Sequence, residues 1–213
     1  MNTLYQRLAG ESISDALLRL EADIKARPAD ADLRAAFVQF LILSGNWARA
    51  LTQLKSWLAL KPQAKPTVTL LEQAIQGEQQ RARAFAGEVR PAMPEAQWPW
   101  LTTLAQALTE SAGQAQTLRL AALEQAPASR GQVTLENEES HTFEWLMDGD
   151  ARLGPVCETL VNGRYFWVPF CAIDAIRFQA PASLASESCV KTAMVASLKT
   201  FPRQTARPRT TWP

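Results

Sequence analysis

The chain is poor in the residues that most often carry catalysis or hold metals. It has one histidine, His141, and three cysteines among 213 residues. An odd cysteine count without Cys-x-x-Cys spacing argues against a disulfide framework and a zinc site, and it suits a reducing cytosol. Cys157 and Cys171 stand in apolar runs, which predicts buried, unreactive thiols. Glycine-rich phosphate loops are also missing, so the sequence predicts no enzyme, no metal site and no cofactor.

The chain has nearly equal numbers of basic and acidic residues and no long apolar segment. With 22 basic and 21 acidic residues, the net charge of +1 gives no electrostatic case for nucleic acid or a membrane surface. The longest apolar run, near 37–43, is far shorter than the ~20 residues that cross a bilayer. The first residues lack the apolar segment of a signal peptide. We therefore expect a soluble cytoplasmic protein that binds no nucleic acid and does not insert into a membrane.

Apolar residues at helical spacing run through the first 127 positions. Pro28 and Pro62 end two of these patterns, and Gly45 suits the left-handed residue after a third. Ser14 and Asp30 or Asp32 are the expected N-caps of the first two helices. The expected helices span 12–28, 30–43, 47–60, 67–87, 95–110 and 114–126.

Two of these helices repeat each other at a spacing of 34 residues. A small residue where paired helices approach and a proline after the second helix are typical of tetratricopeptide (TPR) repeats. Ala115 and Pro127 give a partial third copy. The pattern favours a TPR-like helical array over an unrelated helix bundle. The matched positions are Ala16 with Ala50, Leu20 with Leu54, and Pro28 with Pro62.

From residue 131 the apolar period changes to that of strands. Asn162-Gly163 between two apolar runs predicts a two-residue β-hairpin, because both residues must take positive φ. The segment 171–178 suits a helical turn or a final strand. We expect an α+β protein: a TPR-like domain at 1–128, then a small antiparallel β domain at 129–184, a twisted sheet or partly open barrel of about four or five strands.

One dense group of charged side chains occurs in the chain, formed by Asp148, Asp150, Arg152 and Glu158. As metal ligands or an acid–base pair, these residues would make a small hydrolase or ligand-binding enzyme. We favour a structural turn at 148–150 fixed by Arg152, because a hydrolytic site normally needs a further base or nucleophile nearby.

Tryptophans are concentrated in the helical half. Most aromatic residues belong to cores, yet the concave face of a helical array commonly binds a peptide or helix. The sequence Trp98-Pro99-Trp100 at a helix start is unable to bury both rings on one side. The candidate partner-binding residues are Trp98, Trp100, Trp47 and Trp57.

The segment 145–170 contains Trp145, Asp148-Gly149-Asp150, Arg152-Leu153-Gly154-Pro155 and Asn162-Gly163, and with these residues it resembles the signature of the ImpE family, also called TagJ or SciE. This resemblance implies a non-enzymatic accessory protein of bacterial type VI secretion. It also implies binding of a contractile-sheath component, the N-terminal helix of the small sheath subunit TssB, with a role in sheath disassembly by the ClpV ATPase. The residues that carry the resemblance, which we expect to be structural, are Trp145, Asp148, Gly149, Asp150, Arg152, Leu153, Gly154, Pro155, Glu158, Asn162, Gly163, Tyr165, Trp167 and Pro169.

The last segment, 185–213, differs in composition from the rest. It holds five basic residues and one acidic residue, a net of +4, while the first 184 residues hold 17 and 20, a net of −3. A short amphipathic helix over 190–201 is compatible with its apolar spacing, and the final prolines and arginines predict disorder. Since proteins of the resembled family continue differently after 180–184, we expect a truncated or frame-shifted end.

Overall fold

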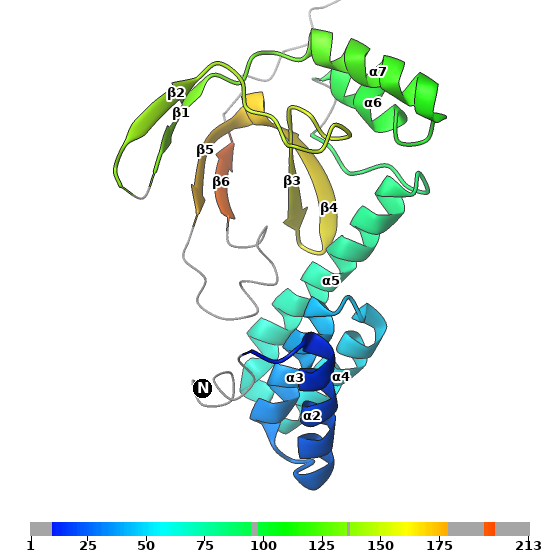
Figure 1. The fold of residues 1–213 in the computed structure, drawn as a ribbon, viewed down its shortest axis with the longest axis vertical. Coiled ribbons are helices and arrows are strands. Elements are labelled where there is room, and N and C mark those ends of the chain that lie inside the picture. Colours follow the sequence, from blue (N-terminus) through cyan, green and yellow to red (C-terminus); the bar gives the residue numbers. More distant parts are fainter. Residues whose placement is uncertain (1–9, 95–97, 136, 179–193, 199–213) are drawn as a thin grey trace, which may run out of the picture.

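The computed structural model describes residues 10–94, 98–135, 137–178 and 194–198. Within these ranges, six α-helices are followed by three antiparallel two-stranded ladders (Figure 1). The predicted α+β class is therefore confirmed. Among the described residues, no helix is both long and apolar enough to span a membrane.

Four helices form the first half of the fold, and their ends follow local chemistry. The side chain of Ser12, rather than Ser14, caps the first helix by accepting the N–H of Asp15 at 3.1 Å. Asp30 caps the second, and Gly45, at φ +71°, follows its end as predicted. The bounds are α2 Ile13–Ala26, α3 Ala31–Leu43, α4 Trp47–Leu60 and α5 Lys65–Phe85, with a 3₁₀ turn, η1 Pro62–Ala64, before α5.

Positions 34 residues apart in α2 and α4 have matching structure. The C-cap residues Arg27 and Lys61 adopt nearly the same backbone angles, φ −134° and ψ 72° against φ −138° and ψ 81°. The repeated alanines and leucines of these helices are all completely buried. The sequence repeat thus corresponds to a repeat of packing, while its assignment to the TPR class stays a prediction.

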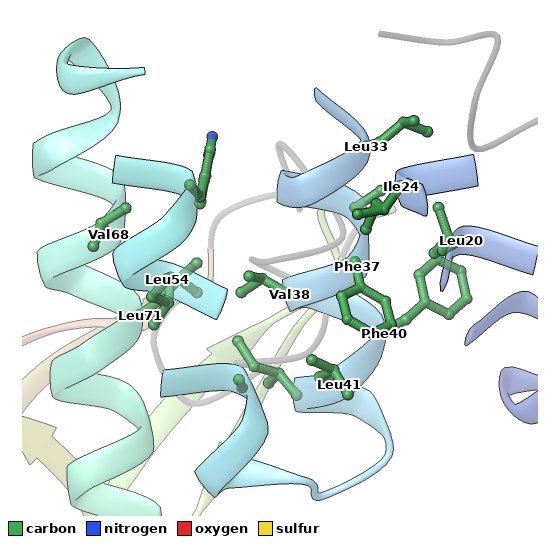
Figure 2. Close-up of a cluster of buried hydrophobic side chains, with 14 of the residues drawn as sticks. Leu20, Ile24, Leu33, Phe37, Val38, Phe40, Leu41, Leu54, Val68 and Leu71 are labelled. Carbon is green, nitrogen blue, oxygen red and sulfur yellow. The ribbon is translucent and has the colours of Figure 1, made fainter. Parts of the chain in front are cut away.

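The first hydrophobic core lies among α2, α3, α4 and the first half of α5 (Figure 2). Almost every side of α3 is buried in it, which explains why its sequence is apolar all round. Val68 and Leu71 bring α5 into the same core. Trp47 and Leu51 of α4 pack against its margin.

The second half of α5 belongs to another core. There Ala84 is buried together with side chains of α6 (Pro99–Gln106), α7 (Ala112–Gln125) and the later strands. Helix α6 begins at Pro99, which occupies its first turn, and ends at Gln106, so among the described residues it is shorter than the expected 95–110. The change from helix to strand falls near residue 128, but this second core joins residues from both sides of that position.

The strands form three separate antiparallel ladders. β1 Gly131–Thr134 pairs with β2 Ser140–Phe143, and β3 Val156–Val161 pairs with β4 Arg164–Pro169. A 3₁₀ turn, η2 Phe170–Ala172, leads to β5 Ile173–Phe178, which pairs with β6 Met194–Leu198. Asn162 and Gly163 connect β3 to β4 with φ of 50° and 75°, so the predicted two-residue hairpin is confirmed.

Two details of the β region differ from expectation. The described strands make three two-stranded ladders and no continuous sheet or barrel. The helix considered over 190–201 is wrong for Met194–Leu198, which is β6, because these residues pair with β5. The remainder of that helix, and the expected disorder of the tail, lie outside the described residues.

Candidate functional site

The charged group singled out in the sequence divides into two separate arrangements. The first is the turn at 148–150, which closes on itself. The carboxylate of Asp148 accepts the N–H of Asp150 at 2.8 Å, and that of Asp150 accepts the N–H of Arg152 at 2.9 Å. The Asp148 N–H in turn donates to the Gly154 carbonyl at 2.7 Å. These are the side-chain-to-backbone bonds of successive Asx turns.

Arg152 completes this turn through its side chain. Its guanidinium donates to both carboxylate oxygens of Asp150, with Nη2 at 2.6 Å and Nε at 2.9 Å from the nearest oxygens. The hydrogen bonds and charge of Arg152 outweigh partial burial and lower the pKa of Asp150 to about 2. The Arg152 guanidinium also lies 4.2 Å from the centre of the Phe85 ring, which attaches the turn to the end of α5.

The second arrangement surrounds Glu158, on β3. This carboxylate is 6% exposed and receives hydrogen bonds from Arg81 Nε at 2.6 Å, from Arg81 Nη2 at 3.3 Å and from the Tyr165 hydroxyl. The indole N–H of Trp167 donates to the same hydroxyl at 2.7 Å. Because three donors converge on one buried carboxylate, the motif residues of β3 and β4 form a polar network inside the second core.

Protonation in this network follows from burial and charge. Burial, reinforced by the hydrogen bond to Glu158, raises the pKa of Tyr165. For Arg81, burial alone would lower the pKa, but the hydrogen bond and charge of Glu158 prevail and raise it. The phenol and the guanidinium therefore keep their protons at neutral pH and serve as fixed donors.

The tip of the β3–β4 hairpin rests on α5. Gln80 connects them twice: its Oε1 accepts the N–H of Tyr165 and its Nε2 donates to the Gly163 carbonyl, both at 3.2 Å. A Cβ on Gly163 would lie 2.8 Å from Gln76 Oε1, and a Cβ on Gly77 would lie 2.6 Å from Leu160. A larger residue at either position would thus displace the end of the Gln76 or Leu160 side chain, and at 163 the φ of +75° also favours glycine.

A segment after α5 adds to the other side of β4. Ala92 accepts the N–H of Trp167 at 2.8 Å and donates its own N–H to the Tyr165 carbonyl at 3.0 Å, a parallel bridge. Sequence reasoning missed Arg81, Gln80, Phe85 and Ala92 as partners of the motif. The basic, polar second half of the long helix was the available signal, since an arginine there is the natural partner for a carboxylate in an aromatic strand.

The other motif residues are mostly structural in position. Leu153, Pro155 and Pro169 are buried, and Gly154 takes φ +55°. Gly149 and Asp148 are exposed. Trp145 differs from the predicted core aromatics, because its side chain is 48% exposed.

The candidate partner-binding tryptophans have unequal surroundings. Trp57 and Trp100 are 7% and 3% exposed and belong to the two cores, so neither has surface to offer a partner in this conformation. Trp98 is half-buried against the second core. Trp47 is half-buried and lines a shallow hollow.

This hollow lies where the α3–α4 turn meets the middle of α5. Its volume is about 290 Å³. Its walls are Ile42, Leu43, Gly45, Trp47, Ala74, Ile75 and Glu78.

The one histidine and the two described cysteines have different surroundings. His141 stands exposed on β2, with Nε2 3.9 Å from a carboxylate oxygen of Glu139. Cys157 is buried as predicted, and Cys171 is half-buried. Within the described ranges, no three His, Cys, Asp or Glu side chains are grouped as metal ligands.

Comparison with known proteins bears on the same segment. Residues 140–199 match the family model described as ImpE protein. This match continues to residue 199. The sequence analysis placed the departure from the family after residues 180–184, and the match corrects that position. The Pseudomonas aeruginosa protein named type VI secretion system accessory component TagJ is 38% identical over 176 residues, covering 81% of this chain and 61% of that relative.

The fold has a counterpart among solved structures. The crystal structure of protein VPA1032 from Vibrio parahaemolyticus superposes with a TM-score of 0.73 and 26% identity, over 86% of this chain and 69% of that one. The chain spans 61%, about three fifths, of the length of the Pseudomonas aeruginosa relative. Residues 140–199, which include the motif around Glu158 and the 162–163 hairpin, are thus similar to the ImpE family.

Proposed function

We propose that this protein is a non-enzymatic adaptor of a type VI secretion system, which binds a helix of a contractile-sheath component through its helical half. The observation that carries the proposal is the 38% identity to TagJ, named as an accessory component, across 81% of the chain. The small sheath subunit, through its N-terminal helix, is the partner we favour. Binding there would let the protein modulate sheath disassembly by the ClpV ATPase in the cytoplasm.

The geometry of the charged residues supports an adaptor over a hydrolase. Both carboxylates of the 148–150 turn are engaged by backbone N–H groups or by Arg152, within the turn itself. Glu158 is enclosed among Arg81 and Tyr165. A general base needs a carboxylate that reaches substrate, and here the aspartates instead close their own turn while Glu158 connects β3 to Arg81 of α5.

The helical half supports the binding role. The hollow beside Trp47 has a largely apolar lining and a volume of about 290 Å³, at the lower end of the ~300–1,000 Å³ typical of small-molecule sites. That size suits one or two side chains of a partner. Helix-in-groove recognition uses such hollows, with anchors at i, i+3, i+4 and i+7 of the bound helix.

A direct titration tests the proposal. A fluorescent peptide of the small sheath subunit's N-terminal helix is added to the full chain, and binding is followed by anisotropy. We expect saturable binding in the micromolar range, because one helix buries less than the ~800 Å² per partner of a standard interface. A scrambled peptide of equal composition is the control. Absence of saturation with correctly folded protein would remove the sheath-binding function.

A further inference from the structure

The hollow beside Trp47 has chemical features that specify what it can accept. Its floor consists of Ile42, Ala74 and Ile75, which are 4%, 6% and 0% exposed. Its rim includes Leu43, which is 38% exposed, and the half-buried Trp47. Filling it with an apolar side chain would remove both from water, which is favourable by roughly 25 cal/mol per Å² of apolar surface.

The electrostatic character of this hollow is negative. Glu78 is its one charged lining residue, and no lysine or arginine lines it. The C-terminal end of α3 lies at the same rim, and the last turn of α3 contains no basic side chain. The N-terminus of α4, which begins at the lining residue Trp47, lies at the same rim, so the opposite partial charges of the two helix ends largely cancel. The Glu78 carboxylate is therefore the group that would attract a cation on the partner.

The backbone around the hollow also limits the kind of partner. The walls come from α3, α4 and α5 and from the turn at Gly45. Backbone N–H and C=O groups within helices are already paired with each other, so a partner strand has no ladder to extend there. Recognition must therefore use side chains, as a docked amphipathic helix does.

We propose that the hollow receives an aliphatic or aromatic anchor of an amphipathic partner helix, and that a lysine or arginine one turn away on that helix pairs with Glu78. This inference rests on the proposed function and deepens it, by stating the charge and the anchor that the bound helix must carry. It also assigns separate roles to the described residues: Leu43 and Trp47 hold the anchor, and Glu78 selects the cation.

The test uses two designed helical peptides and the sheath peptide with the full chain. The designed pair has the same leucine stripe, flanked by lysine in one peptide and by glutamate in the other. We expect the lysine peptide to bind more than tenfold tighter than the glutamate peptide. Glu78→Gln should weaken the lysine peptide about twofold to fivefold, the range of one exposed ion pair. Glu72→Gln, on α5 but outside the hollow, should change it less than 1.5-fold (about the range of surface substitutions).

Two apolar variants test the anchor. Leu43→Gln, at a position that is 38% exposed, should weaken binding of both the lysine peptide and the sheath peptide about tenfold, and its folding is also checked by circular dichroism. Trp47→Ala should weaken binding about thirtyfold, and its folding is checked by circular dichroism because the ring packs against the first core. In 1 M salt, where the screening length is about 3 Å, the difference between wild type and Glu78→Gln should vanish.

The outcomes separate the two proposals. If the lysine peptide binds through Glu78 and Leu43 while the sheath peptide does not bind, the sheath function fails and the chemistry of the hollow stands. If the sheath peptide binds but Leu43→Gln and Glu78→Gln leave its affinity and that of the lysine peptide unchanged, the sheath function stands and this inference is overturned. Equal binding of the two designed peptides would also overturn it.

Discussion

Replacing Arg81 by methionine tests whether the polar network at Glu158 holds the two halves of the protein together. Methionine keeps much of the length of the arginine stem but removes the guanidinium, and with it the hydrogen bonds at 2.6 and 3.3 Å to a carboxylate that is 6% exposed. Removing one partner of a buried ion pair destabilises a fold by about 3–5 kcal/mol. Most of this cost is the charge left behind in the core.

Urea denaturation followed by tryptophan fluorescence measures the effect, since Trp167 lies in the network. With an m value of about 2 kcal/mol/M, the midpoint should fall by about 2 M. Arg83→Met is the matched control on the same helix, because Arg83 pairs with Glu88 while both side chains are more than half exposed, at 57% and 58%. That control should cost about 1 kcal/mol or less. Equal shifts for the two variants would refute the structural role of the network.

Further substitutions test the turn and the hairpin. The pKa of Asp150, lowered from 3.8 to about 2, means that its ionised form stabilises the fold above pH 3.8 and that this contribution is lost as pH falls towards 2. Asp150→Asn should therefore unfold more easily than wild type at pH 7, and the difference in urea midpoint should shrink below pH 3.8; a difference independent of pH would contradict the pairing with Arg152. Gly163→Ala should destabilise the protein by about 1–3 kcal/mol in the same assay, because φ is +75° and the new Cβ would lie 2.8 Å from Gln76 Oε1. Gly149→Ala, whose Cβ would meet nothing within 4 Å, should change stability by less than 0.5 kcal/mol (about the limit for surface sites), and similar losses for both would show that the hairpin contact is unimportant.

Local chemistry was sufficient to predict several elements of the fold. The glycine before α4 and the proline after it predicted its bounds, Trp47–Leu60, as the structure has them. Asn162-Gly163 predicted the β3–β4 hairpin. Both depend on neighbours in sequence, through caps and turn angles. By contrast, the split of the β region into three ladders depends on which strands meet, and strand patterns do not specify partners.

The candidate site shows the same division between local and distant contacts. The 148–150 turn was predictable because its partners lie within a few residues. Glu158 and Arg81 are 77 positions apart in the sequence, and no pattern in either segment predicts that the two side chains pair. Burial of Trp57 and Trp100 was also beyond sequence reasoning, since a tryptophan on a helix serves a core or an interface equally well.

The sharing of α5 between two cores has a consequence during synthesis. Arg81 leaves the ribosome 77 residues before Glu158, and Gln80 leaves it 83 residues before Gly163. At roughly 5–20 residues per second, the second half of α5 waits about 4 to 15 s for its partners. During that interval Ala84 and Phe85 lack the strands that cover them in the finished core. Until those strands are synthesised, Ala84 and Phe85 thus stay uncovered by them at the end of an otherwise polar helix segment, and transiently exposed apolar surface of this kind favours aggregation.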